Sequence, residues 1–231
     1  MRIVVLGSVF FILFHCSSVC QEGPSQSALR ELRPLAEQLQ EAFDKRDFHL
    51  VCDRIESLYN SMQTLRPSLD TPENLLNELE ASLSKTPLTR DSAVFRIAFR
   101  AEQAGQYDKA RRYAIEAQEY ARRQGKYRVQ NGYYANQVLG LLALREGDTA
   151  AAGRFLLASV DEGGWPLLAT VGPNLLLAQR LTIAKEVDPV IRYLERCKDL
   201  WPSGESKVIG WLAALRAGKI PDFSPHQLIH P

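Results

Sequence analysis

Apolar residues recur at three- and four-residue intervals along most of the chain beyond residue 20, as they do in amphipathic helices. The segment 27–45 carries one such stripe, formed by Leu29, Leu32, Leu35, Leu39 and Phe43. The segment 48–65 carries a second stripe, and Pro67 ends it because proline disrupts a helix interior. No segment beyond residue 20 shows the sustained alternation of a strand. The sequence therefore predicts an all-α fold.

A third helix is expected from Pro72 to about Ser84. Thr71 is suited to the N-cap position, and Pro72 fits the first helical position, where its missing N–H is not needed. The carboxylates of Asp70 and Glu73 would lie near the positive end of the helix dipole. The sequence at 86–87, Thr-Pro, is expected to break the chain before the next helix.

Residues 89–160 contain two similar helix-turn-helix units. In each unit a glycine, Gly105 or Gly147, follows an apolar helix and can take the left-handed conformation that closes it. An alanine, Ala110 or Ala152, stands five residues later and allows the two helices to approach closely. Tyr107 can fill the wedge between the helices of the first unit. The two units are therefore expected to be stacked helical hairpins.

These units resemble tetratricopeptide repeats, in which a glycine, an aromatic residue and a small residue occupy the same relative positions. Thr149 departs from this pattern because it stands where the aromatic residue would be. The two glycines are 42 residues apart, whereas the usual period of the family is about 34. The units are therefore expected to be elongated or irregular members of a short solenoid.

The resemblance implies a concave groove, formed by the first helix of each unit, that binds a protein or peptide. The residues at the corresponding positions that are proposed to contact a partner are Glu102, Gln103, Tyr134, Gln137 and Arg145. Others at these positions, including Phe95, Phe99 and Leu141, are better interpreted as core because an apolar helix stripe is usually buried.

The C-terminal part, 161–231, is expected to hold a degenerate third pair at 173–200 and a capping helix at 206–217. Lys185 stands where the closing glycine would be, and Asp188-Pro189 is expected to start the second helix. Residues 160–223 are similar to a C-terminal module of bacterial tetratricopeptide-like proteins of unassigned function. Trp165 is either an exposed anchor or, preferably, a plug between the second and third pairs. The helices at 27–65 are compatible with another degenerate unit.

Residues 1–20 have the organisation of a secretory signal peptide. Arg2 precedes the apolar run 3–14, which is short for a membrane span, and a polar stretch follows. Cleavage after Cys20 or Ser18 would leave 21–88 as an N-terminal helical region of a periplasmic or secreted protein. An uncleaved anchor is the alternative, and lipidation of Cys16 or Cys20 is disfavoured because no small residue precedes either cysteine. Membrane attachment is expected only if this terminus is retained or lipidated.

The charge balance argues against nucleic acid as the partner. The chain carries 28 basic and 27 acidic residues, and a dedicated nucleic-acid binder usually has a strong basic excess. The one basic region is 90–128, with Arg111, Arg112, Arg122, Arg123 and Arg128. A surface for an acidic partner is one interpretation. A solvated face with the helical pairs Arg112–Glu116 and Glu119–Arg123 is preferred.

Cysteine and histidine positions indicate neither a metal nor a catalytic site. Cys52 and Cys197 lie in helical patterns and are interpreted as buried thiols, with a bridge between them as the alternative. His226 and His230 have ligand spacing but lie among prolines, so a solvated tail is expected.

No nucleotide-binding, metalloprotease or hydrolase motif occurs. A non-catalytic adaptor without cofactor is therefore the leading hypothesis. The alternatives are a structural component tethered to the cell envelope and a hydrolase with groove carboxylates such as Glu102.

Overall fold

A computed structural model gives the fold of this chain. It describes residues 71–85, 90–123, 125, 127–161, 163–164, 166–223 and 226, together with 33–35, 37–39, 41–42, 44–45, 50, 54 and 57. The predicted signal segment 1–20 lies outside the described residues, as do Cys52, His49, Trp165 and His230. The chain forms two compact units, Met1–Leu69 and Asp70–Pro231.

The described residues of the first unit are consistent with the two helices expected there. Residues 33–35, 37–39, 41–42 and 44 are helical, and all of them fall inside the predicted helix at 27–45. Leu39 and Ala42 are buried, whereas Lys45 and Glu41 form an exposed ion pair with N···O 2.7 Å. Residues 50, 54 and 57, in the second predicted segment, are also helical.

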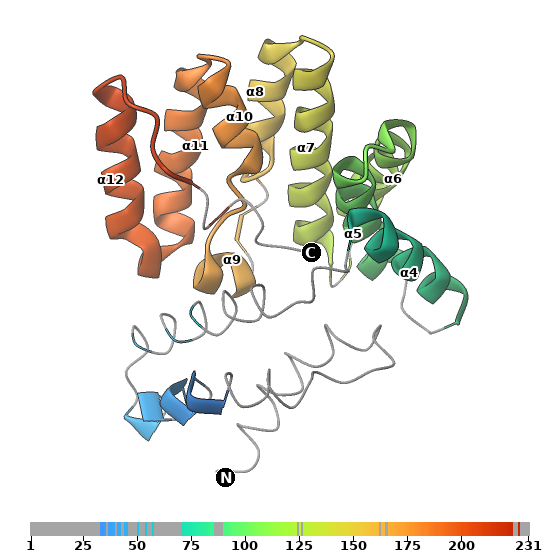
Figure 1. Cartoon of the computed structure of the whole chain (residues 1–231), viewed down its shortest axis with the longest axis horizontal. Helices are drawn as coiled ribbons and strands as arrows, with labels where there is room; N and C mark the ends of the chain where they lie inside the picture. Colours follow the sequence, from blue (N-terminus) through green and yellow to red (C-terminus); the bar gives the residue numbers. More distant parts are fainter. Residues whose placement is uncertain are drawn as a thin grey trace. The chain divides into compact units, whose positions relative to one another are not determined.

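The second unit is built from helices, and its described residues contain no strand. The helices are α4 Pro72–Lys85, α5 Arg90–Gln103, α6 Tyr107–Ala121, α7 Arg128–Arg145, α8 Thr149–Ala158, α9 Pro166–Val171, α10 Leu176–Ile183, α11 Val187–Leu200, the 3-10 turn η1 Pro202–Gly204, and α12 Glu205–Arg216. Figure 1 shows α7, α8, α10, α11 and α12 as neighbouring helices with roughly aligned axes. The all-α prediction is confirmed.

The first of these helices begins where the sequence predicts. The Oγ1 atom of Thr71 accepts a hydrogen bond of 3.2 Å from the backbone N–H of Asn74, which is the expected N-cap interaction. Pro72 is the first helical residue, and the helix ends at Lys85, one residue beyond the predicted end.

The same turn geometry closes three of the helices. The residues Gly105, Gly147 and Lys185 follow α5, α7 and α10 with φ of 73°, 85° and 66°. After each of them, a backbone N–H bonds to the carbonyl five residues earlier, at 2.8, 2.9 and 2.9 Å. This is the Schellman arrangement, which satisfies carbonyls at a helix end. Each turn leads after three residues into a second helix that packs on the first, giving the pairs α5–α6, α7–α8 and α10–α11.

Lys185 is the one non-glycine residue with positive φ among the described residues. A non-glycine residue in this conformation destabilises the folded chain by roughly 1–2 kcal/mol. Replacing it with glycine removes that cost, but part of the gain is lost because glycine has more conformational entropy in the unfolded chain. We therefore expect Lys185→Gly to raise the free energy of unfolding by about 1 kcal/mol. Urea unfolding of both proteins measures the change. Lys219→Gly is the matched control because this exposed lysine is not left-handed; an equal gain there would contradict the explanation.

The start of α11 differs from the sequence expectation. Its N-cap is Glu186 and its first helical residue is Val187, so Asp188 and Pro189 lie inside the first turn. The Schellman turn after α10 places Glu186 directly at the helix start. Pro189 is tolerated at the third helical position because the first N–H groups of a helix have no partner within it.

The helix α7 is the centre of the second unit. It packs against α5, α6, α8 and α10, and its residues are buried on almost every side. The unusual spacing of the two closing glycines reflects the length of α6 and α7, which have 15 and 18 residues, and the connection between them. The helix α12 packs on α11 and ends the series.

Candidate functional site

Three of the predicted contact residues, Tyr134, Gln137 and Glu102, are buried. Tyr134 is 2% exposed, and its ring stacks on that of Phe95 with centroids 5.2 Å apart. Gln137 is 1% exposed, and its Nε2 donates a hydrogen bond of 3.1 Å to the Oγ of Ser159. The expectation that these side chains line an exposed groove is wrong, because α5, α6, α8 and α10 pack around α7.

Glu102 is buried beneath a residue of the third helix pair. Its Oε1 accepts a hydrogen bond of 3.1 Å from Nη1 of Arg180. The Glu102 side chain is 5% exposed and that of Arg180 is 45% exposed. The other carboxylate oxygen of Glu102 is buried and accepts no hydrogen bond among the described residues. The ion pair therefore joins the last turns of α5 and α10.

Sequence reasoning missed Arg180, although a signal for it exists. Arg100 and Arg180 each stand five residues before the left-handed residue that closes their helix, Gly105 or Lys185. If the third helix pair is aligned with the first so that Lys185 matches Gly105, Arg180 of α10 falls at the position of Arg100 on α5. Because the predicted groove was drawn from 89–160 alone, it omitted this contribution.

Gln103 and Arg145 lie nearer the surface, and each has an interaction within the chain. Gln103 Oε1 accepts a hydrogen bond of 2.8 Å from Nη1 of Arg100. The Arg145 guanidinium lies 3.7 Å from the ring centroid of Tyr107, in the geometry of a cation–π contact. These two residues and Arg180 are the charged and polar groups that α5, α7 and α10 present in their last turns.

Several basic residues of the segment 90–128 make contacts other than the predicted ones. Both oxygens of Glu116 accept hydrogen bonds from Arg90 of α5, and Arg111 pairs with Glu146. The pairs Arg112–Glu116 and Glu119–Arg123 do not form among the described residues. Instead, the two arginines lie over tyrosine rings, at 5.1 Å for Arg112 and 5.2 Å for Arg123.

A buried polar cluster joins α7 to α11. The Tyr133 hydroxyl accepts a hydrogen bond of 2.9 Å from the backbone N–H of Asn174 and lies 3.0 Å from the Tyr193 hydroxyl. Burial raises the pKa of both phenols above their usual value. A phenol is protonated at neutral pH even at its usual pKa, so both hydroxyls are neutral here. They satisfy one another inside the core, which is the condition for burying polar groups without a large cost.

The thiol of Cys197 adjoins this cluster and is chemically inert. It is fully buried and unbonded to another cysteine, as expected for a buried thiol. Burial raises its pKa to about 12. The thiolate is the reactive form of cysteine, so at neutral pH this side chain behaves as a small apolar residue.

The described residues near the C-terminus, 221–223 and His226, pack against the fold, contrary to the prediction that His226 lies in a solvated tail. His226 is 2% exposed, and its ring contacts those of Trp201 and Trp211, at centroid distances of 4.9 and 5.3 Å. Its carbonyl accepts a hydrogen bond of 2.8 Å from the N–H of Leu175. Phe223 is also fully buried, against Trp211. Contact with the apolar rings of two tryptophans stabilises the buried position of His226 and Phe223, although proline-rich segments are usually exposed.

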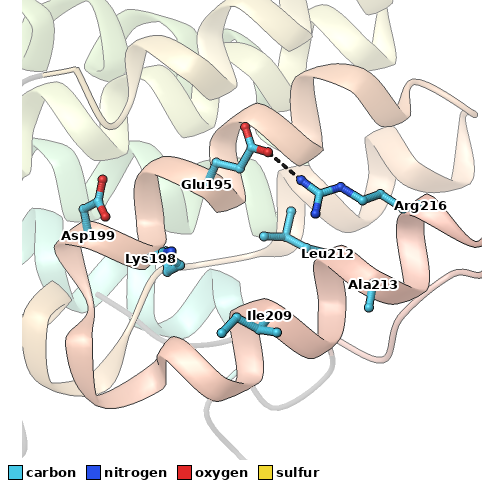
Figure 2. A pocket seen from close by; sticks show the side chains of 7 residues that line it. All are labelled: Glu195, Lys198, Asp199, Ile209, Leu212, Ala213 and Arg216. Carbon is cyan, nitrogen blue, oxygen red and sulfur yellow. Dashed lines mark hydrogen bonds and ion pairs between the residues drawn. The ribbon is translucent and has the colours of Figure 1, made fainter.

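A groove runs between α11 and α12 and has a volume of about 400 Å³. The residues that line it are Glu195, Lys198, Asp199, Ile209, Leu212, Ala213 and Arg216. Figure 2 shows the Glu195 carboxylate directed at the Arg216 guanidinium, with the apolar side chains on α12. The Arg216–Glu195 hydrogen bond is 2.7 Å. The groove is thus lined by three apolar side chains of α12 and by four charged side chains of both signs.

Among the described residues, no three histidine, cysteine or acidic side chains are placed to hold a metal ion. No helix in the described part of the chain has both the length and the apolar character that crossing a membrane requires. No protein-family model, curated protein or solved structure matches the chain.

Proposed function

We propose that this protein is a non-catalytic helical-repeat protein that binds a protein or peptide partner. The observation that supports the proposal is the recurrence of one turn. The helices α5, α7 and α10 end in the same left-handed closure, and each leads into a second helix packed on the first. Stacked hairpins of this kind, as in tetratricopeptide-like solenoids, present extended surfaces on which partners bind.

The chemistry of the described side chains also favours binding. The Cys197 thiol and the two core phenols are fully buried and therefore out of reach of a substrate. The Glu102 carboxylate is covered by Arg180 and is therefore poorly placed to act on a substrate. The signal-like segment 1–20 supports the further proposal that binding takes place outside the cytoplasm, in the periplasm or after secretion.

The surface that fits this role is formed by the last turns of α5, α7 and α10. We call it the A-helix surface and define it by Gln103, Arg145, Arg180 and Ile183. Ile183 is 61% exposed and supplies an apolar contact, while the other three supply hydrogen-bond donors. Interfaces with a small apolar centre and a polar rim are typical of peptide recognition.

Selection of binding peptides from a random library, with the full chain as target, tests this proposal. The dissociation constant of an enriched peptide is then measured by fluorescence anisotropy. Ile183→Asp is expected to weaken binding at least roughly tenfold, which corresponds to about 1.4 kcal/mol. Ile115→Asp is the matched control, because Ile115 is 48% exposed on α6, outside this surface. Failure to enrich any peptide, or equal losses in both variants, would contradict the proposal.

A further inference from the structure

The helix α12 has the closure of a first helix, but no second helix follows it among the described residues. Gly218 has a φ of 72°, and the N–H of Lys219 bonds to the carbonyl of Ala214 at 2.9 Å, as in the three earlier turns. After α5, α7 and α10, this turn leads into a helix that packs on its predecessor. After α12, residues 219–223 are non-helical, and Phe223 returns to the core. No described helix follows α12 to cover its outer face.

This outer face is apolar at its centre. Ile209 is 53% exposed, and it lines the groove with Leu212 and Ala213. Apolar groups exposed in this way gain free energy when another surface covers them. The groove between α11 and α12 therefore has the shape and composition to receive one face of a helix.

Gly210, beside Ile209, points to a close contact. A glycine inside a helix costs about 1 kcal/mol relative to alanine. A Cβ atom at Gly210 would meet no atom within 4 Å, so packing within the chain does not require glycine there. A helix from another molecule could approach the backbone closely at this position.

The charges along α12 identify the partner that fits. Glu205 is at the beginning of the helix and Arg216 is at its end. A second α12 packed in the antiparallel direction places Glu205 of each copy beside Arg216 of the other, and Ile209 beside Leu212. A parallel arrangement would instead bring like charges together. Antiparallel packing is self-complementary, as the symmetric interface of a two-fold dimer requires.

We propose that a second copy of this chain docks on α12, so that α12 of each copy lies in the α11–α12 groove of the other. The dimer buries Ile209 at its centre, and the Glu205–Arg216 pairs lie at its rim. Both rim residues already have neighbours within the chain, Lys198 at 3.7 Å and Glu195 at 2.7 Å. Because exposed ion pairs of this kind contribute little stability, exchanging these partners on association costs little.

Light scattering coupled to size-exclusion chromatography, applied to the full chain over a range of concentrations, tests the proposal. The wild-type protein is expected to be dimeric. Ile209→Glu should raise the dissociation constant of the dimer by roughly 100-fold, because it places a charge in the centre of the interface. Ile115→Glu, an equally exposed isoleucine on α6, should leave the dimer intact. Circular dichroism verifies that both variants remain folded.

A charge exchange distinguishes this symmetric interface from other modes of association. Glu205→Arg alone and Arg216→Glu alone should each weaken the dimer, because each places like charges across the axis. The double variant should restore association in part, because every new arginine then faces a new glutamate across the axis, while each also meets a like charge, Lys198 or Glu195, in its own chain. A wild-type chain that is monomeric at all concentrations would overturn the proposal and leave the groove to a helix of another protein. Failure of the double variant to restore association would also overturn it.

Discussion

Replacing Gly172 with alanine is expected to lower the free energy of unfolding by about 3 kcal/mol, from two additive penalties. Gly172 has a φ of 96°, a conformation that L-residues with a side chain rarely adopt. In addition, an alanine Cβ would lie 2.8 Å from the ring atoms Cε2 and Cζ2 of Trp201. Real Cβ atoms do not approach a ring this closely, so either the ring or the backbone must move.

Trp201 has no room to move. It is fully buried and is in contact with the rings of Trp211 and His226. On another side it lies against Gly204, where an added Cβ would come within 2.2 Å of the ring. Overpacking of a filled core typically costs about 1–3 kcal/mol, and here the rigid ring places the cost toward the upper end.

Urea unfolding followed by circular dichroism measures the effect, and Gly147→Ala is the matched control. Gly147 has a φ of 85°, and a Cβ there would meet no atom within 4 Å. Gly147→Ala therefore carries the backbone penalty alone, about 1 kcal/mol. If Gly172→Ala destabilised the chain no more than this control, the packing of Trp201 against Gly172 would not have the cost inferred from the structure.

The helices could be predicted because their signals are local. The Thr71 cap, the glycine at 105 and the glycine at 147 each act through atoms within a few residues along the chain. Lys185 was correctly placed at the degenerate turn for the same reason, since its neighbours repeat the pattern. Stripes of apolar residues then sufficed to identify the helical segments.

The side chains of the candidate site could not be placed in this way. Whether Tyr134 or Gln137 is exposed depends on how α5, α8 and α11 pack around α7, and no local signal specifies that packing. The Glu102–Arg180 pair joins residues 78 positions apart in sequence. A stripe of one helix specifies which residues face inward, but not which distant helix covers the remaining faces.

The tail was misjudged for a related reason. Prolines at 221 and 225 are typical of exposed loops, yet Pro221 and Phe223 are buried. The tryptophans that cover His226 belong to the end of α11 and to α12. Their large apolar rings supply the burial that the composition of the tail alone does not suggest.

The burial of His226 leads to a specific prediction about acid stability. Burial, assisted by the positive charge of Lys207, lowers the pKa of His226 from 6.5 to about 4 in the folded chain. The Lys207 ammonium itself lies 5.4 Å from the ring centroid of Trp201, the ring that His226 also contacts. A proton on His226 would therefore place a second positive charge in an apolar setting beside an existing one.

Between pH 6.5 and about 4, the unfolded chain binds a proton at His226 that the folded chain does not take up. The contribution of His226 is therefore fully present above pH 6.5 and is lost as the pH falls toward 4. Across this window it lowers the free energy of unfolding by roughly 3 kcal/mol. His226→Phe retains an aromatic ring against Trp201 and Trp211 but cannot titrate. Urea unfolding of both proteins at pH 7, 6, 5 and 4 isolates the effect, since all other groups are shared. We expect the stability of the wild type to fall more steeply than that of the variant over this range. Parallel curves would show that His226 is protonated without cost and that its surroundings in the folded chain are open to water.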